Sequence, residues 1–177
     1  ILENIDAEYL HNLTIKMGEF CRSFQMPNES FAWFNGGSLI EKNLIKQTLN
    51  RIGYKNRIFN VAEESGYCRL SSNDTVIFMD IGLPQKVSVD TKASLFAFEL
   101  FYKKEKIISN LGEIYGSKVK SMNNSLASTA AHSTLNIDDR NNLDLTGRRK
   151  IEILNSKYQK TKEGGIINVM HSGYGAI

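Results

Sequence analysis

The fold of this chain is decided by the stretch Thr91-Lys92-Ala93-Ser94-Leu95-Phe96-Ala97-Phe98-Glu99-Leu100. Its apolar and aromatic character continues to residue 102, a polar turn follows over 103–106, and a second short apolar run begins at Ile107-Ile108. Two such runs joined by a short turn are typical of a β-hairpin. We therefore expect strands over 95–102 and 106–110, within a sheet that the earlier segments lead into and the later ones continue.

A loop over 128–141 comes after this hairpin and contains Ala131-His132-Ser133-Thr134-Leu135. We expect it to present one histidine, His132, at the mouth of a further strand over 134–138. The polar segment 113–127, with Gly116 and Asn123-Asn124, is expected to be a surface loop.

Two helices are predicted before the strands. Apolar residues recur at steps of three and four over 1–24 and predict a helix that Pro27 ends, since proline disfavours helix at the residue before it. We expect this helix to pack against neighbours outside the chain. Ser38 and Glu41 form a capping box for a second helix over 39–52, which ends at Gly53.

The remaining apolar runs predict strands with short turns. Together with the segments above they give about eight strands, and that spacing favours an antiparallel β-sandwich preceded by two helices. The further strands are expected over 31–34, 57–61, 66–70, 75–81, 148–158 and 166–171.

Composition limits the class of protein. The chain has 177 residues, 41% of them hydrophobic, and a net charge of +3, which is enough for one core but is not the signature of a nucleic-acid-binding domain. The mild positive charge suits an acidic polysaccharide, but ordinary solubility explains it more simply. No run approaches the ~18 apolar residues of a membrane span, so no membrane partner is expected. Cys21 and Cys68 have no metal-type spacing and are interpreted as free thiols.

Several motifs, in this order and spacing, resemble the heparinase II/III family of polysaccharide lyases at its C-terminal β-sandwich. The resemblance covers about 31–174. Its pieces are Phe34-Asn35-Gly36, Ser65-Gly66-Tyr67-Cys68-Arg69-Leu70, the segment 93–100, Ala131-His132-Ser133-Thr134-Leu135 with Asp138-Asp139, and His171-Ser172-Gly173-Tyr174.

The resemblance implies an α/α toroid followed by an antiparallel sandwich, with residues 1–30 as the end of the toroid and 31–177 as a truncated sandwich. It also implies β-elimination on uronic-acid polysaccharides of the heparin, heparan sulfate or alginate kind. The base and acid of the family lie mostly on the toroid, so this fragment alone is expected to be inactive and the missing toroid is its expected partner. The resemblance is strongest to the bacterial branch of the family, and it implies a location in the periplasm or outside the cell.

The family sandwich carries zinc, and the resemblance maps its ligand positions onto Lys92, Asn110 and His132. A charged lysine repels a metal ion, a neutral amide is a poor zinc ligand, and zinc needs about three protein donors even at an open site. We therefore predict no bound zinc and no other cofactor.

The candidate site residues each have two interpretations. His132 either contacts substrate in the cleft between toroid and sandwich or fixes its own loop. Lys92 either pairs with a uronate carboxylate or is a solvated charge at a strand edge. His171 and Tyr174 suggest acid–base chemistry, but turn geometry with a positive φ at Gly173 explains them more simply.

The chain as a whole has two leading interpretations, ranked above an unrelated β-sandwich binding module, which would explain the strands but not the ordered motifs. The first is the sandwich part of a lyase active on glycosaminoglycan-like polymers. The second is a carbohydrate-binding or scaffold sandwich without catalysis, whose metal site has decayed; Lys92 and Asn110 favour it. Glu99 alternates with Phe98, so one of the two is expected to face outward, and paired carboxylate chemistry is not indicated.

Overall fold

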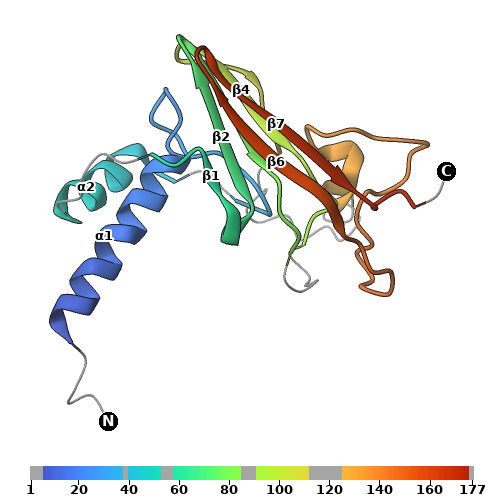
Figure 1. The fold of residues 1–177 in the computed structure, drawn as a ribbon, viewed down its shortest axis with the longest axis horizontal. Helices are drawn as coiled ribbons and strands as arrows, with labels where there is room; N and C mark the ends of the chain where they lie inside the picture. The colour runs from blue at the N-terminus through green and yellow to red at the C-terminus, as the bar shows by residue number, and fades with distance from the viewer. Residues whose placement is uncertain (1–5, 38–39, 53–57, 85–90, 112–124, 176–177) are drawn as a thin grey trace.

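The computed structural model describes residues 6–37, 40–52, 58–84, 91–111 and 125–175. Two helices come first and strands follow (Figure 1). Along the chain the elements are α1 Ala7–Phe24, α2 Lys42–Ile52, β1 Val61–Ala62, the 3₁₀ helix η1 Glu63–Ser65, β2 Tyr67–Ser72, β3 Thr75–Asp80, β4 Phe98–Tyr102, β5 Glu105–Ile108, the 3₁₀ helix η2 Thr129–Ala131, β6 Ile153–Thr161 and β7 Gly164–His171.

Both predicted helices form. The Asp6 side chain caps α1 by accepting a hydrogen bond of 2.9 Å from the Glu8 N–H. The helix ends at Phe24, three residues before Pro27, as its sequence predicts. Helix α2 begins at Lys42 rather than at 39, and the predicted capping serine, Ser38, lies outside the described residues.

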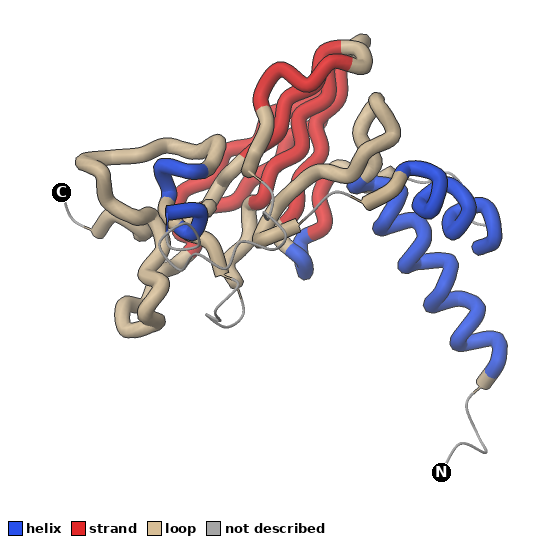
Figure 2. Tube along the Cα trace, turned by 180° about the vertical axis from the view of Figure 1, so that it is seen from behind, coloured by secondary structure: helices blue, strands red, loops and turns tan. Residues whose placement is uncertain are grey.

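The strands form two antiparallel sheets, which confirms the predicted sandwich. One sheet has the order β1-β2-β3-β4-β5, and the other is the β6–β7 pair. Strand β7 packs over β2, where the backbone of Gly165 approaches the Leu70 side chain. Figure 2 shows the helices at one end of the sheets and the long loops at the other.

Four strand predictions are corrected. The strand predicted over 57–61 does not form at 58–60, and β1 begins only at Val61. Residues 31–34 are extended but form only an isolated bridge between Gln25 and Phe31. Residues 134–138 also lack a strand, because the chain turns back at Asp138 and Asp139 (φ 52 and 51). Two consecutive positive φ values are typical of a tight type I′ turn. The strand predicted over 148–158 begins later, at Ile153.

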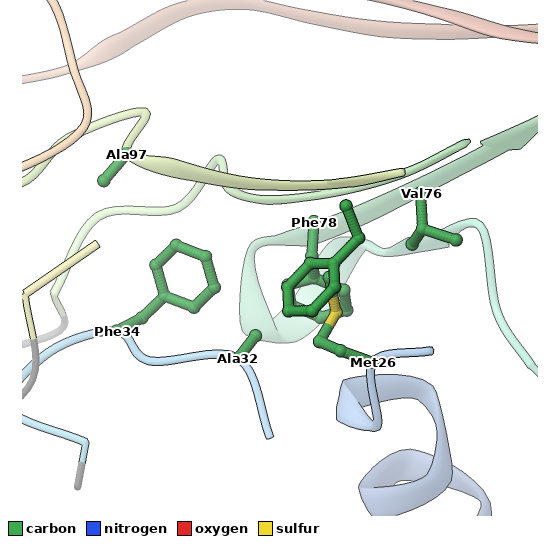
Figure 3. Packing of buried hydrophobic residues seen from close by; sticks show 7 residues of the cluster. Met26, Ala32, Phe34, Val76, Phe78 and Ala97 are labelled. Atoms are coloured by element: carbon green, nitrogen blue, oxygen red, sulfur yellow. The ribbon is translucent and has the colours of Figure 1, made fainter. Parts of the chain in front are cut away.

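The main core lies between the C-terminal end of α1 and the face of the larger sheet that points away from the β6–β7 pair (Figure 3). Phe78 on β3 and Phe101 on β4 have no solvent exposure, and burial of such rings is the main favourable term in folding. Residues 24–34, which continue from α1, cover these rings on the same side of the sheet, with Met26 and Phe34 buried against them. This packing holds Trp33 beside the strands that carry the candidate site.

Helix α1 leaves an apolar stripe in solvent. Tyr9 and Met17 are 62% and 60% exposed, although their spacing is that of a buried helical face. No helix in the described part of the chain is long and apolar enough to cross a membrane. Cys21 and Cys68 are free thiols, as predicted.

Candidate functional site

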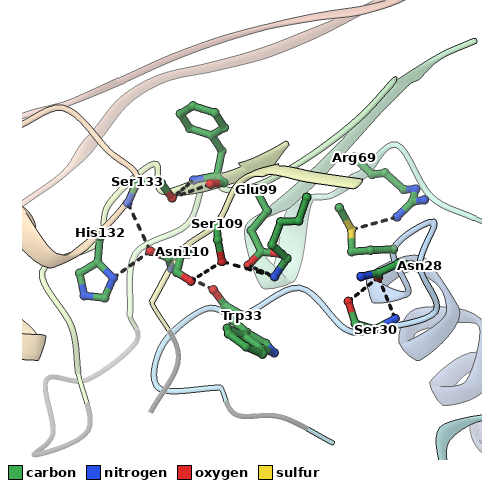
Figure 4. Close-up of polar contacts among 12 residues, drawn as sticks. Asn28, Ser30, Trp33, Arg69, Glu99, Ser109, Asn110, His132 and Ser133 are labelled. Atoms are coloured by element: carbon green, nitrogen blue, oxygen red, sulfur yellow. Dashed lines mark hydrogen bonds and ion pairs between the residues drawn. The ribbon is translucent and has the colours of Figure 1, made fainter. Parts of the chain in front are cut away.

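Asn110 is the central residue of the candidate site (Figure 4). It follows β5, is 1% exposed, and donates a hydrogen bond of 2.9 Å from Nδ2 to the Trp33 carbonyl. Its Oδ1 atom lies 2.9 Å from His132 Nδ1 and accepts a hydrogen bond of 3.3 Å from the Ser133 N–H. One amide therefore joins the segment after α1 to the loop that carries His132.

The His132 ring is fixed from both sides. Its Nε2 atom lies 3.1 Å from the Leu126 carbonyl, while Nδ1 faces Asn110. Both neighbouring atoms are acceptors, and a neutral imidazole can donate to only one of them. Burial lowers the pKa of His132, the Leu126 carbonyl opposes this, and the positive charge of Lys92 lowers the pKa further. The charge of Lys92 therefore acts on the His132 ring.

The loop over 128–142 is hydrogen-bonded along the segment 93–98. Thr129 Oγ1 donates to the Ala93 carbonyl at 2.7 Å, and Thr134 Oγ1 donates to the Leu95 carbonyl at 2.6 Å. The buried Asn142 side chain binds both the N–H and the carbonyl of Leu95. These bonds give the loop its shape without a strand, and they bring the half-buried Lys92 next to it.

The zinc site that the resemblance implies is not supported by this donor set. Asn110 Oδ1 already accepts two hydrogen bonds, and both His132 nitrogens have partners. Lys92 brings a positive charge to the third position. In the described ranges no group of three or more His, Cys, Asp or Glu side chains is placed to hold a metal ion. These residues do not fit zinc.

A buried ion pair lies beside this cluster, and the sequence did not indicate it. Glu99 is fully buried on β4, with Oε1 3.1 Å from Lys106 Nζ, and that ammonium lies 4.3 Å from the centre of the Trp33 ring. Burial raises the pKa of Glu99, while Lys106 and the N–H groups of Trp33 and Asn110 oppose the rise. Among the described residues, Glu99 Oε2 has no hydrogen-bond partner.

A second cluster contains the motif His171-Ser172-Gly173-Tyr174. His171 Nδ1 accepts a hydrogen bond of 2.8 Å from the Gly173 N–H, and its ring packs edge-on against Phe96 at 4.8 Å. Phe96 has a φ of 60°, a rare conformation for a bulky residue. The Tyr174 hydroxyl donates to the Leu135 carbonyl, so this motif holds the second sheet against the loop.

The predicted positive φ at Gly173 is wrong. Its φ lies outside the left-handed region, and glycine is needed there because a Cβ atom would lie 2.0 Å from the Asn142 carbonyl oxygen. The requirement comes from a close backbone approach between two segments, which no local sequence pattern reveals.

The two earlier motifs meet at Asp80. Asn35 Nδ2 donates to Asp80 Oδ2 at 2.8 Å, and Tyr67 contributes its hydroxyl to the same cluster. Gly66, with φ 70°, is so close to Gly82 that a Cβ would lie 2.4 Å from the Gly82 Cα. Burial raises the pKa of Asp80 to about 6, against the hydrogen bonds from Asn35 and Gly82.

Comparisons with known proteins agree with this architecture. The family model for the heparinase II/III-like C-terminal domain matches residues 55–177. A crystal structure of heparinase III is similar, with a TM-score of 0.62 and 16% identity, over 86% of this chain and 29% of that one. The structure of a heparan sulfate lyase HepC mutant from Pedobacter heparinus is similar with a TM-score of 0.63 and 18% sequence identity. That match covers 86% of this chain and 27% of the lyase chain. The chain thus spans less than a third of these proteins. No curated protein sequence matches it.

Proposed function

The chain belongs to the heparinase II/III-like C-terminal family of polysaccharide lyases. We propose that it is the sandwich part of an enzyme that cleaves uronic-acid-containing polysaccharides by β-elimination. The family match over residues 55–177 carries the proposal. The heparin, heparan sulfate and alginate kinds of polymer remain its candidate substrates. A glycosaminoglycan is favoured because the similar solved structures are a heparinase III and a heparan sulfate lyase.

β-Elimination removes the C5 proton of a uronate and builds negative charge on its carboxylate. A cation placed against that carboxylate lowers the barrier because it is held where the charge develops. Lys92 is our candidate for this contact, since it is half-buried beside the loop and acts electrostatically on His132. The base and acid would come from a helical domain upstream, so the fragment alone would be inactive.

His132 is proposed to be a positioning residue rather than a substrate ligand. Both of its ring nitrogens face acceptors of the protein itself, Asn110 Oδ1 and the Leu126 carbonyl. A substrate hydroxyl would have to displace one of these contacts. In this proposal His132 keeps the loop in place, and the loop in turn keeps Lys92 at the cleft, with no zinc involved.

The partner of this sandwich is proposed to be the helical domain of the same longer chain. The exposed apolar stripe of α1, which includes Tyr9 and Met17, supports such a contact. An acidic polysaccharide is the proposed ligand, and the periplasm or the extracellular space is proposed as the location from the family resemblance alone.

A second candidate is a sandwich that binds carbohydrate, or serves as a scaffold, without catalysis. One observation favours it: Lys92 and Asn110 occupy two positions where the family resemblance implies metal ligands. A sandwich that had evolved from a lyase into a carbohydrate-binding protein would be expected to lose the metal ligands and keep the fold.

A lyase assay on the full-length protein separates the candidates. Heparin, heparan sulfate and alginate are offered without added metal, and the ultraviolet absorbance of the unsaturated product is followed. We expect product, with kcat/KM lowered about tenfold or more in Lys92→Gln but unchanged in Lys104→Gln, an exposed turn residue. Equal rates in both variants would remove Lys92 from the site. No product on any uronate polymer would leave the non-catalytic candidate.

A further inference from the structure

A pocket of 400 Å³ lies between the C-terminal end of α1, helix α2 and strand β2. It shares no residue with the cluster around His132, and Arg69 and His132 lie on opposite sides of Glu99 in Figure 4. Of the described side chains that line it, three are cationic, Arg22, Lys46 and Arg69, and one is a carboxylate, Glu29. Its volume is within the range of ordinary ligand pockets.

Arg69 carries a charge that the protein compensates only in part. The residue is 7% exposed, and its Nη1 atom donates to the carbonyls of Ser23 at 2.9 Å and Gln25 at 3.1 Å. These carbonyls belong to the C-terminal end of α1, where the helix has partial negative charge. Partial charges do not replace a carboxylate, and burial lowers the pKa of Arg69 to about 10.

Two of these cations, Arg69 and Lys46, are not paired with a described carboxylate. The hydrogen bonds of Arg69 to described residues are all made by Nη1, which leaves Nε and Nη2 as donors. A guanidinium presents its donors in a planar fork that matches carboxylate and sulfate oxygens.

We infer that this pocket binds an oxyanion, namely a carboxylate or sulfate group of an acidic polysaccharide at a subsite separate from Lys92. Arg69 is the fixed donor at its base, and Lys46, exposed on α2, closes the site as a mobile point charge. The oxyanion site stands on the pocket alone, whereas its assignment to a polysaccharide rests on the proposed function. If the charges served only to tie α1 to β2, added anions would have no specific effect.

The test uses the full-length protein, the variant Lys46→Gln and the matched control Lys157→Gln. Both substitutions remove one positive charge from an exposed lysine, and only Lys46 lines the pocket. Sodium sulfate is titrated at constant ionic strength against chloride, and the melting temperature is followed. Sulfate also stabilises proteins by exclusion from their surface, so the difference between the two variants is the readout.

We expect the half-saturating sulfate concentration to rise about tenfold in Lys46→Gln and to stay at the wild-type value in Lys157→Gln. A second titration with digalacturonate, a carboxylate without sulfate, shows which oxyanion is preferred. A response to sulfate alone points to a sulfated polymer, and a response to digalacturonate alone to an unsulfated one. Equal responses of all three proteins to both probes would overturn the inference.

Failure of this inference is distinguishable from failure of the proposed function, because the titrations measure binding without turnover. Lyase product together with equal sulfate responses would keep the enzyme and remove the subsite. A selective loss of sulfate response in Lys46→Gln, with no lyase product, would keep the oxyanion site and remove the lyase proposal.

Discussion

Asn110 Oδ1 lies 2.9 Å from His132 Nδ1, and the same amide donates to the Trp33 carbonyl 77 residues earlier in the chain. This one buried side chain therefore determines where the His132 loop stands relative to the segment after α1. Zinc could hold such segments together with charge, whereas here an uncharged amide does so through polar contacts with Trp33, His132 and Ser133. The geometry of the cleft would then depend on Asn110.

Asn110→Ala is expected to lower the free energy of unfolding of the sandwich by about 2–4 kcal/mol. The change leaves the Trp33 carbonyl and the Ser133 N–H without their partner in a buried place, and unmade buried hydrogen bonds are costly. Urea unfolding of the full-length protein, followed by near-ultraviolet circular dichroism, measures it. Asn43→Ala, on the exposed face of α2, is the control. A cost as small as that of the control would contradict this role.

Asp80 is expected to make the sandwich lose stability as pH rises from about 4 to about 6. In the unfolded chain its carboxyl ionises near its ordinary pKa of 3.8, but in the folded protein it keeps its proton up to about 6. Between these values the folded state binds more protons, so stability falls with pH, by at most about 3 kcal/mol.

Asp80→Asn tests this directly, because an amide does not titrate in that range. We expect the variant to lose most of the decline between pH 4 and pH 6 in thermal melts. The raised pKa of Glu99 acts in the same direction, so a residual slope should remain. If Asp80→Asn had the full wild-type slope, the decline would belong to other groups.

Gly173→Ala is expected to destabilise the sandwich by about 3 kcal/mol or more. Its Cβ would lie 2.0 Å from the Asn142 carbonyl oxygen, which belongs to backbone that also carries the Asn142–Leu95 bonds. Gly175→Ala is the matched control: it has open space around it and only a positive φ of 73°, which costs about 1 kcal/mol. Similar melting temperatures for the two variants would contradict the prediction, because they would show that the backbone at Asn142 shifts at little cost to make room for the Cβ atom.

The sequence predicted the parts of this fold that depend on local pattern. The hairpin of β4 and β5 followed from two apolar runs and a polar turn, and α1 from its apolar steps. The segments over 31–34 and 134–138 have similar composition but are not strands, because tertiary hydrogen bonds, such as that from Thr134 to Leu95, replace a ladder. Amino-acid composition does not show whether the backbone N–H and C=O groups of a segment bond to a neighbouring strand or to side chains elsewhere in the protein.

The candidate site was predictable only through the family resemblance. The resemblance assigned Lys92, Asn110 and His132 to one site. In the structure Asn110 and His132 are in contact with each other, and the charge of Lys92 acts on His132. Trp33 was missed because its carbonyl, not its ring, binds Asn110. Glu99 was missed because alternation along a strand does not say which face is buried; Lys106 across the hairpin was the available signal.

The melting temperature of the wild-type protein is expected to be the same with added zinc and with a chelator, because Lys92, Asn110 and His132 do not make a zinc donor set. The double variant Lys92→His/Asn110→Asp supplies an imidazole and a carboxylate next to His132, and zinc should raise its melting temperature by several degrees. The single variant Asn110→Asp is the control, since it adds a carboxylate but keeps the repelling ammonium, and it should respond weakly. Zinc content of the purified proteins, measured by mass spectrometry, gives a second readout.

If the wild-type protein contained one zinc ion and melted at a lower temperature with a chelator, Asn110 would have to act as a metal ligand, and the proposed metal-free site would be wrong.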